Sequence, residues 1–220
     1  MANEYNVATA SPAGLATNKV IRNTYILLSI TLLFSAVMTG VGMAIKLSFG
    51  ASLGCSIGAL GLLWFVLPRT ANSSAGLGVV FAITGLLGLG LGPTITYYLS
   101  MPNGAELVMT AMGGTGAIFL GLSGYALTTR KDFSFMGGFL VVGLVVAIVA
   151  MIANIFLGIP ALSLAVSAVV VMLMSGYILY YTSSMIHDGQ ANYLMITIGL
   201  YVALLNMFTS LLHLLSFADD

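Results

Sequence analysis

The chain has 220 residues, of which six are basic and six acidic, so charged residues make up 5% of the total. Soluble domains usually carry about 25% charged residues, and this composition excludes a water-soluble fold whose surface is covered by ionic groups. Hydrophobic residues make up 60% and the mean hydropathy is +1.10, which predicts a protein with several membrane-spanning helices. The formal net charge is zero, so charge gives no argument for a nucleic-acid partner.

Residues 1–18 come first in the chain, and they are mostly small or polar with no helical period. We expect them to form a flexible tail, followed by a single transmembrane domain over residues 19–220. The first apolar run has no small-residue cleavage site after it. We therefore expect this run to be an uncleaved anchor rather than a signal peptide.

Seven apolar runs follow, each long enough to cross a bilayer, which takes about 20 helical residues. They cover residues 25–45, 49–67, 76–99, 105–127, 135–157, 161–181 and 193–217. The linkers between them contain the prolines, glycines and charged residues that are typical of turns. The sequence therefore predicts an all-α membrane protein with seven transmembrane helices.

Small residues recur four apart in three of these runs, a spacing that lets helix backbones approach closely. The positions are Gly50, Gly54 and Gly58 in the second run, Gly88 and Gly92 in the third, and Gly113, Ala117 and Gly121 in the fourth. We expect these faces to pack helices together within one chain rather than to form a dimer seam. We also expect Pro93 to kink the third helix.

The basic residues favour one orientation. Only Lys46 falls on one side of the alternating runs, and the other five fall on the amino-terminal side: Lys19, Arg22, Arg69, Arg130 and Lys131. The positive-inside rule then predicts a cytoplasmic amino terminus. Asp219 and Asp220 would end outside.

Ionisable residues are scarce within the runs. Glu106 and His213 lie near the outer ends of two runs, and His187 and Asp188 lie in the turn before the last run, so we interpret all four as interfacial residues. Cys55 is the only cysteine, which excludes a disulfide within the chain and makes a thiol metal site implausible. We expect no metal, no cofactor and no enzymatic activity.

One motif suggests an enzyme. The segment Gly121-Leu122-Ser123-Gly124 matches the GxSG motif of rhomboid-type intramembrane serine proteases. Those enzymes need a histidine on a neighbouring helix to accept the serine proton. The sixth run carries tyrosines instead, and His187 lies in a turn. The protease hypothesis is therefore disfavoured.

Polar residues also recur inside the last three runs: Asn154 in the fifth, Tyr177 and Tyr181 in the sixth, and Tyr201 and Asn206 in the seventh. Hydrogen bonding between helices accounts for such residues, and we favour this interpretation. A polar path through the centre of the bundle remains the alternative.

Three segments then carry a resemblance. Residues 129–134 read Thr-Arg-Lys-Asp-Phe-Ser, residues 178–183 read Ile-Leu-Tyr-Tyr-Thr-Ser, and residues 200–208 read Leu-Tyr-Val-Ala-Leu-Leu-Asn-Met-Phe. They resemble the basic-Asp-Phe-Ser turn, the sixth-helix Leu-Tyr-Asp-Thr segment and the seventh-helix Leu-Tyr-Leu-Asp-x-x-Asn-Leu-Phe segment of the Bax-inhibitor/YccA (transmembrane Bax inhibitor motif) family. Residues 19–25 and 153–157 are most similar to its bacterial YccA-like branch. Arg130, Lys131 and Asp132 would form the cytoplasmic family motif.

The resemblance implies a fold in which six helices surround a central seventh. In several family members, aspartates on helices six and seven form a pH-sensitive latch over a calcium-leak path, because two carboxylates that share a proton titrate near neutrality. Tyr181 and Ala203 occupy those two positions here. Neither residue supplies a carboxylate, so this chain departs from the usual latch.

For the YccA-like branch, the resemblance implies a bacterial inner-membrane protein that associates with the membrane-anchored ATP-dependent protease FtsH, as its substrate and as its modulator. The tail of residues 1–18 would be the handle that the protease grips. The first function hypothesis is therefore a non-enzymatic modulator of a membrane protease. The second is a leak channel or transporter, for calcium or another cation, that does not use an aspartate pair.

Overall fold

The computed structural model describes residues 12–188 and 191–218. In chain order the elements are α1 (Pro12–Ala44), α2 (Phe49–Gly61), the π-helical segment η1 (Leu62–Val66), α3 (Leu67–Thr70), α4 (Ala75–Leu99), α5 (Gly104–Thr129), the 3-10 turn η2 (Ser134–Met136), α6 (Gly137–Leu157), α7 (Pro160–His187) and α8 (Tyr193–Ala218). Among the described residues, seven helical segments are long and apolar enough to cross a membrane, and α2, η1 and α3 together make one of them. The predicted all-α class with seven spans is confirmed.

Helix α1 begins at Pro12, so residues 12–18 are helical rather than part of the expected tail. Proline is favoured in the first turn of a helix, because its missing N–H would have no partner there, and Ala13, Leu15 and Ala16 are good helix formers. The rest of the expected tail, residues 1–11, lies outside the described residues. The expected outer position of Asp219 and Asp220 also falls outside them.

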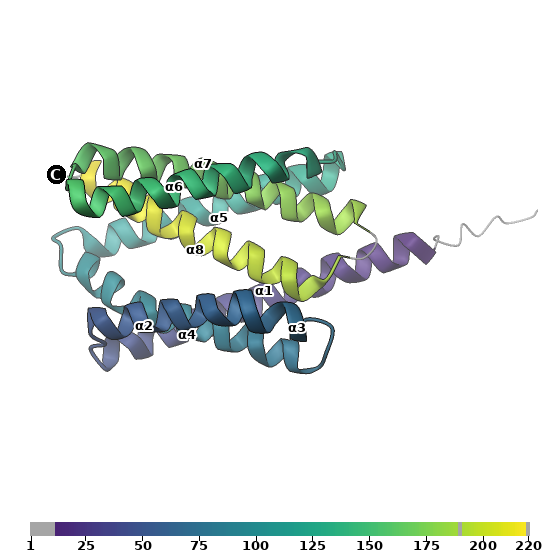
Figure 1. Ribbon diagram of the computed structural model, residues 1–220, viewed down its shortest axis with the longest axis horizontal. Helices are drawn as coiled ribbons and strands as arrows, with labels where there is room; N and C mark the ends of the chain where they lie inside the picture. The colour runs from purple at the N-terminus through teal and green to yellow at the C-terminus, as the bar shows by residue number, and fades with distance from the viewer. Residues whose placement is uncertain (1–11, 189–190, 219–220) are drawn as a thin grey trace, which may run out of the picture.

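Helix α8 lies at the centre of the bundle (Figure 1). It packs against α1, α4, α5 and α7, and more than half of its most apolar window is buried, the largest share among the seven segments. Helix α2 packs mainly on α4, and α6 packs on α7. The expected central last helix is confirmed, with four helices directly around it and two more outside them.

The tightest packing joins α1 to α4. Gly88 and Gly92 are buried, and a Cβ atom at either position would lie within 3.0 Å of the α1 backbone at Ser35 or Gly42. The Leu89 carbonyl lacks its usual helical donor, because the residue four positions later is Pro93, which has no N–H. This carbonyl oxygen instead lies against Gly42 of α1. The expected packing role of this pair is confirmed, and α4 continues as a helix through Pro93. A kink at Pro93 remains a prediction.

The other two small-residue faces were predicted wrongly. A Cβ atom at Gly50, Gly54, Gly113 or Gly121 would meet nothing within 4 Å, and one at Gly58 would make only an ordinary contact, 3.7 Å from the Leu86 side chain; all five glycines are exposed. The buried face of α2 instead carries Ser52 and Ala59, because these residues point at α4. The spacing of small residues identifies helix faces that could pack closely against another helix. It does not tell which of these faces has a helix opposite it.

The helix connections alternate between the two ends of the bundle. One end holds the α3–α4, α5–α6 and α7–α8 connections (right in Figure 1). We call it the basic end, because five of the six basic residues lie there, in α1, in α3 and in the α5–α6 connection: Lys19, Arg22, Arg69, Arg130 and Lys131. Lys46 lies in the α1–α2 connection at the opposite end.

Candidate functional site

A large cavity lies on one side of α8. Helices α2 and α6 form its walls and α7 and α8 its floor, and its volume is about 400 Å³. Because α2 packs mainly on α4 and α6 on α7, the two walls belong to different helix pairs, and we call this cavity the lateral groove. Its lining is Leu60, Leu63, Trp64, Leu67, Leu144, Ile148, Met151, Met174, Tyr177, Tyr181, Met195, Ile198, Gly199, Val202, Ala203 and Asn206.

The α2 wall of the groove contains the π-helical segment η1. The Leu67 N–H donates to the Leu62 carbonyl, five residues back, rather than to Leu63. Pro68 explains this irregularity, because its ring carries no N–H for the Trp64 carbonyl and would clash with that oxygen in a regular helix. Such π turns occur frequently at functional sites. Leu63 and Trp64, which lie in this segment, both line the groove.

Two stacked tyrosines form part of the floor. The rings of Tyr177 and Tyr181 are 5.8 Å apart with an interplanar angle of 23°, because the residues are one helical turn apart on α7. The Tyr181 ring lies directly over the Cα of Gly199 on α8, where any Cβ atom would overlap it. This arrangement of the floor therefore requires glycine at position 199.

Both positions at which the resemblance places the family latch face this groove. Tyr181 and Ala203 line it together, and Ala203 is 1% exposed. Among the described residues that line the groove, none carries a carboxylate. The arrangement therefore offers aromatic rings, two phenol hydroxyls and one amide to a ligand, but no acid that exchanges a proton near neutrality.

The residues proposed for a polar path fall into three places. Tyr177 and Asn206 line the lateral groove. Tyr201 faces the other side of α8, where its hydroxyl lies 2.5 Å from the Ser35 Oγ and donates to the Thr84 carbonyl at 3.3 Å. Asn154 lies in a separate pocket toward the opposite end. A single cavity that holds all of them is not observed within the described residues.

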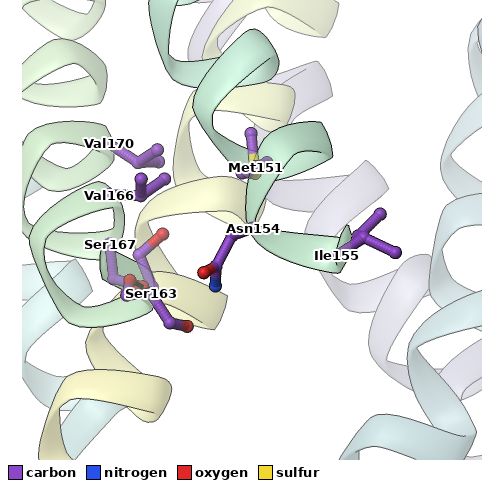
Figure 2. A pocket seen from close by; sticks show the side chains of 8 residues that line it. Met151, Asn154, Ile155, Ser163, Val166, Ser167 and Val170 are labelled. Carbon is purple, nitrogen blue, oxygen red and sulfur yellow. Dashed lines mark hydrogen bonds between the residues drawn. The ribbon is translucent and has the colours of Figure 1, made fainter. Parts of the chain in front are cut away.

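This second pocket, the end pocket, lies between α6 and α7 and has a volume of about 240 Å³. Figure 2 shows Asn154 pointing toward Ser163 while Ile155 points away; Met151, Val166, Ser167, Val170 and Ser210 complete its lining. The Ser163 hydroxyl also lies 2.8 Å from Nε2 of His213. Met151 lines both cavities, so the two approach each other at this side chain.

The basic family motif is held against the end of α7. The Ser183 hydroxyl accepts from the Phe133 N–H at 3.0 Å and lies 3.2 Å from the Lys131 carbonyl, and Ser183 is 1% exposed. Asp132 accepts from the Ser134 N–H at 2.9 Å. This bond is the main reason that the pKa of Asp132 lies below its ordinary value. The Ser134 hydroxyl lowers the pKa further, and nearby His187 has a smaller effect in the same direction. Arg130 and Lys131 themselves are exposed.

The serine of the GxSG motif is in no position to act as a nucleophile. Ser123 is 4% exposed, and its hydroxyl lies 3.3 Å from the Thr182 hydroxyl. His187 instead contacts Ser183, with Nδ1 3.3 Å from that hydroxyl. No base therefore faces Ser123 in the part of the chain that the structure describes.

Sequence reasoning missed several residues of these sites. Trp64 and Gly199 in the groove were not singled out, although the Pro68 that follows Trp64 by four residues is a recognised signal for an irregular helix. Ser183 lies inside the sixth-helix family segment, but nothing in the sequence paired it with residues 131–133. The contact of Ser163 with His213 joins residues 50 apart in the chain, and no local pattern predicts it.

Comparison with known proteins identifies the family. The chain is 48% identical over 205 residues to the Escherichia coli K12 protein named modulator of FtsH protease YccA, covering 93% of each chain. The same identity and coverage relate it to a protein of an E. coli O6:H1 strain named inner membrane protein YccA. It is 46% identical over 206 residues to an uncharacterised membrane protein of Vibrio cholerae, covering 94% of this chain and 92% of that one. A sequence model described as inhibitor of apoptosis-promoting Bax1 matches residues 17–220. The chain therefore belongs to the Bax inhibitor family of membrane proteins.

Proposed function

We propose that this protein is a non-enzymatic modulator of the membrane-anchored ATP-dependent protease FtsH in a bacterial inner membrane. The observation that carries the proposal is the 48% identity, over 93% of both chains, to the E. coli protein named modulator of FtsH protease YccA. Identity at this level extends over nearly the whole chain and is not confined to one motif. A shared partner is then the simplest expectation for the two proteins.

The chemistry of the cavities agrees with a role that needs no catalysis. Within the described residues, no three His, Cys, Asp or Glu side chains gather where they could hold a metal ion, and Ser123 has no histidine beside it. Binding of one membrane protein by another requires surface and shape rather than a reactive group. The proposal therefore rests on contact between the two proteins.

The proposed orientation places the basic end in the cytoplasm. Five of the six basic residues lie at that end, as the positive-inside rule requires. The amino terminus and the motif of Arg130, Lys131 and Asp132 would then face the same compartment. Within the expected tail of residues 1–18, of which 12–18 form the start of α1, residues 1–11 are the proposed handle for the protease, since unfolding motors engage chain termini.

The test measures binding and turnover in one strain. The full-length protein and a variant lacking residues 2–11 would be expressed at equal levels, with a third variant that carries a Gly/Ser segment of the same length as a control for tail length. We expect FtsH to co-purify with the full-length protein, and we expect the deletion, but not the Gly/Ser replacement, to slow turnover. Identical decay of all three proteins, with no complex recovered, would contradict the proposal.

A leak of calcium or another cation is the second candidate function, and one observation favours testing it. The lateral groove and the end pocket approach each other at Met151, so a small movement of this side chain would join them. Proteoliposomes that contain the wild-type protein or Met151→Ala would be compared with empty vesicles between about pH 6 and 8. Flux that rises in M151A supports the leak, and no flux above empty vesicles removes it.

A further inference from the structure

His213 is a titratable residue of the central helix that has no part in the proposed function. It lies five residues before the end of α8 at Ala218, about 8 Å along a helix, at the end of the bundle opposite the basic end. Its side chain is half-buried. Ionisable residues within membrane-spanning helices are rare, and they often mark paths for protons or ions.

Both ring nitrogens of His213 contact hydroxyl groups. Nε2 lies 2.8 Å from the Ser163 Oγ of α7, and Nδ1 lies 3.5 Å from the Tyr98 hydroxyl of α4. A neutral imidazole has one donor and one acceptor nitrogen, whereas the imidazolium ion donates from both. Since a hydroxyl oxygen is able to donate or to accept, these neighbours accommodate the ring in either charge state.

Few other titratable groups lie at this end of the helices that pack on α8. In the part of the chain that the structure describes, they are Tyr97 and Tyr98 on α4, Glu106 on α5 and Lys46 after α1. Lys46 and Glu106 are exposed, while Asp219 and Asp220 lie outside the described residues. The described hydrogen-bonding neighbours of the His213 ring are therefore hydroxyl groups rather than carboxylates.

The end pocket lies beside Ser163 and contains further polar groups. Among the described residues, none hydrogen-bonds the Ser210 hydroxyl. The Oδ1 of Asn154 accepts from the Ile159 N–H at 3.1 Å, but its Nδ2 has no partner within the same residues. Figure 2 shows the Asn154 side chain directed toward Ser163. Donors without a partner are unfavourable inside a membrane, so these groups favour a polar occupant of the pocket.

Water is the occupant that these groups fit. About 240 Å³ of the pocket is open to the centre of a water molecule, whereas one buried water needs about 15 Å³ on this measure and about two to four polar partners. Asn154 and Ser163 each lie three residues from the α6–α7 connection, about 5 Å along a helix. The pocket therefore begins close to the end of the bundle that faces away from the basic end, and water that enters there meets the Ser163 hydroxyl.

We propose that His213 is a proton-binding site, which a water-filled end pocket serves through the Ser163 hydroxyl. In the neutral ring, Nε2 accepts from Ser163. Hydronium in the pocket gives a proton to the Ser163 Oγ while the original hydroxyl proton moves to Nε2, so that water remains, Ser163 stays neutral and the ring gains the charge. The imidazolium then donates to Ser163 on α7 and to Tyr98 on α4, and charged donors make stronger hydrogen bonds. Proton binding thus tightens the contact of the central helix with both neighbours.

Nuclear magnetic resonance of the histidine rings tests proton binding, because the chain has two histidines. The purified full chain with isotopically labelled histidine would be titrated in lipid nanodiscs between about pH 5 and 8, the range in which histidine changes its charge. His187→Gln assigns the signals. We expect the His213 ring to change from a bare Nε2 to two protonated nitrogens as the pH falls. A His213 signal that stays constant, or a bare Nδ1 at high pH, would overturn the proposal.

Two leucine substitutions on α7 test the water path. Ser167 lines the end pocket and Ser175 lines neither cavity, while the hydroxyl of each bonds the carbonyl four residues back on its own helix. We expect S167L to slow proton exchange between the His213 ring and water at least about tenfold, because exchange must then await a local opening. S175L should leave this rate unchanged, and the His187 signal reports in each variant that the fold is retained. Equal rates in the two variants would contradict delivery through the pocket.

Hydrogen exchange of residues 208–216 tests the tightening of the central helix. After correction for intrinsic rates, we expect exchange about fivefold slower at the acid end of the titration than at the alkaline end, the effect of about one strengthened hydrogen bond on a local opening. His213→Gln keeps a donor and an acceptor but takes up no proton in this range, so it should show no such difference. The same difference in H213Q would assign the effect to another group and overturn this role of His213.

Discussion

Two glycine-rich regions of this molecule have the same spacing and opposite surroundings. On α4, Gly88 and Gly92 lie against the α1 backbone, where a Cβ atom does not fit. On α5, Gly113 and Gly121 have the same kind of spacing and face outward, with nothing within 4 Å of an added Cβ atom. In lipid the hydrophobic effect does not drive helices together. Close contact depends on what the opposing helix offers, and opposite Gly88 and Gly92 the α1 helix offers Gly42 and the Thr39 hydroxyl.

Those hydroxyls distinguish the α1–α4 seam from the α5 face. The Thr39 hydroxyl of α1 donates to the Gly88 carbonyl at 2.9 Å, the Ser52 hydroxyl of α2 donates to the Gly90 carbonyl, and Tyr201 of α8 donates to the Thr84 carbonyl. Three helices thus bind the backbone of α4 through side chains, which is possible because glycines bring the backbones close. The exposed glycine face of α5 has no such donors opposite it among the described residues.

The largest expected effect comes from breaking the seam itself. Gly88→Leu forces a side chain into the Ser35 backbone and should lower the free energy of unfolding by about 3 kcal/mol. Gly121→Leu, the matched change on the outward face, should alter it by less than about 0.5 kcal/mol. Unfolding in mixed micelles with increasing SDS measures both. Similar losses in the two variants would show that the α5 face is packed after all.

Removing one hydroxyl from the seam should have a smaller effect. Tyr201→Phe keeps the buried ring but leaves Ser35 and the Thr84 carbonyl without this partner, and it should cost about 1 kcal/mol, in the range measured for hydrogen bonds within membranes. Tyr97→Phe, at an exposed tyrosine of α4, is the control and should change nothing.

A double-mutant cycle with Ser35→Ala isolates the contact between the two hydroxyls. We expect a coupling energy of about 0.6 kcal/mol or more. Additive losses would mean that the Tyr201 hydroxyl acts through the Thr84 carbonyl rather than through Ser35.

The sequence predicted the number of helices, their class and the central last helix, because long apolar runs and the family segments carry that information directly. It did not predict which glycine faces pack, since Gly54 and Gly88 have the same local pattern and differ only in what lies opposite. It placed Tyr181 and Ala203 together through the resemblance, but the groove that they share requires α2 and α6 to stand apart. That separation arises from long-range packing on α4 and α7, which no local pattern encodes.

The turn that follows α5 offers the next test, because one buried side chain, Ser183, contacts its backbone at two positions. Ser183→Ala removes the contacts with the Phe133 N–H and the Lys131 carbonyl. We expect trypsin to cleave at Arg130 and Lys131 about fivefold faster, as for the loss of about one hydrogen bond from a local opening equilibrium. Ser175→Ala is the control, because the Ser175 hydroxyl bonds only its own helix, at the Val171 carbonyl. Equal cleavage of both variants would mean that other contacts hold the turn.

The smallest expected effect is a pH dependence confined to the same turn. The Ser134 N–H lowers the pKa of Asp132 in the folded protein, so the ionised carboxylate favours the folded turn above its ordinary pKa of about 4. This contribution is lost as the pH falls through the lowered value. Hydrogen exchange of residues 130–136, corrected for intrinsic rates, should therefore show constant protection down to about pH 4 and a decline below it.

Asp132→Asn separates charge from geometry in this turn. The amide keeps an oxygen that accepts from the Ser134 N–H, so the turn should persist, but it carries no proton-dependent charge. Protection should be somewhat lower than in the wild-type protein at neutral pH and should not change with pH. If D132N shows the same decline as the wild-type protein, another group controls the turn. His187 is then the first to examine, because it contacts Ser183 and lies near Asp132.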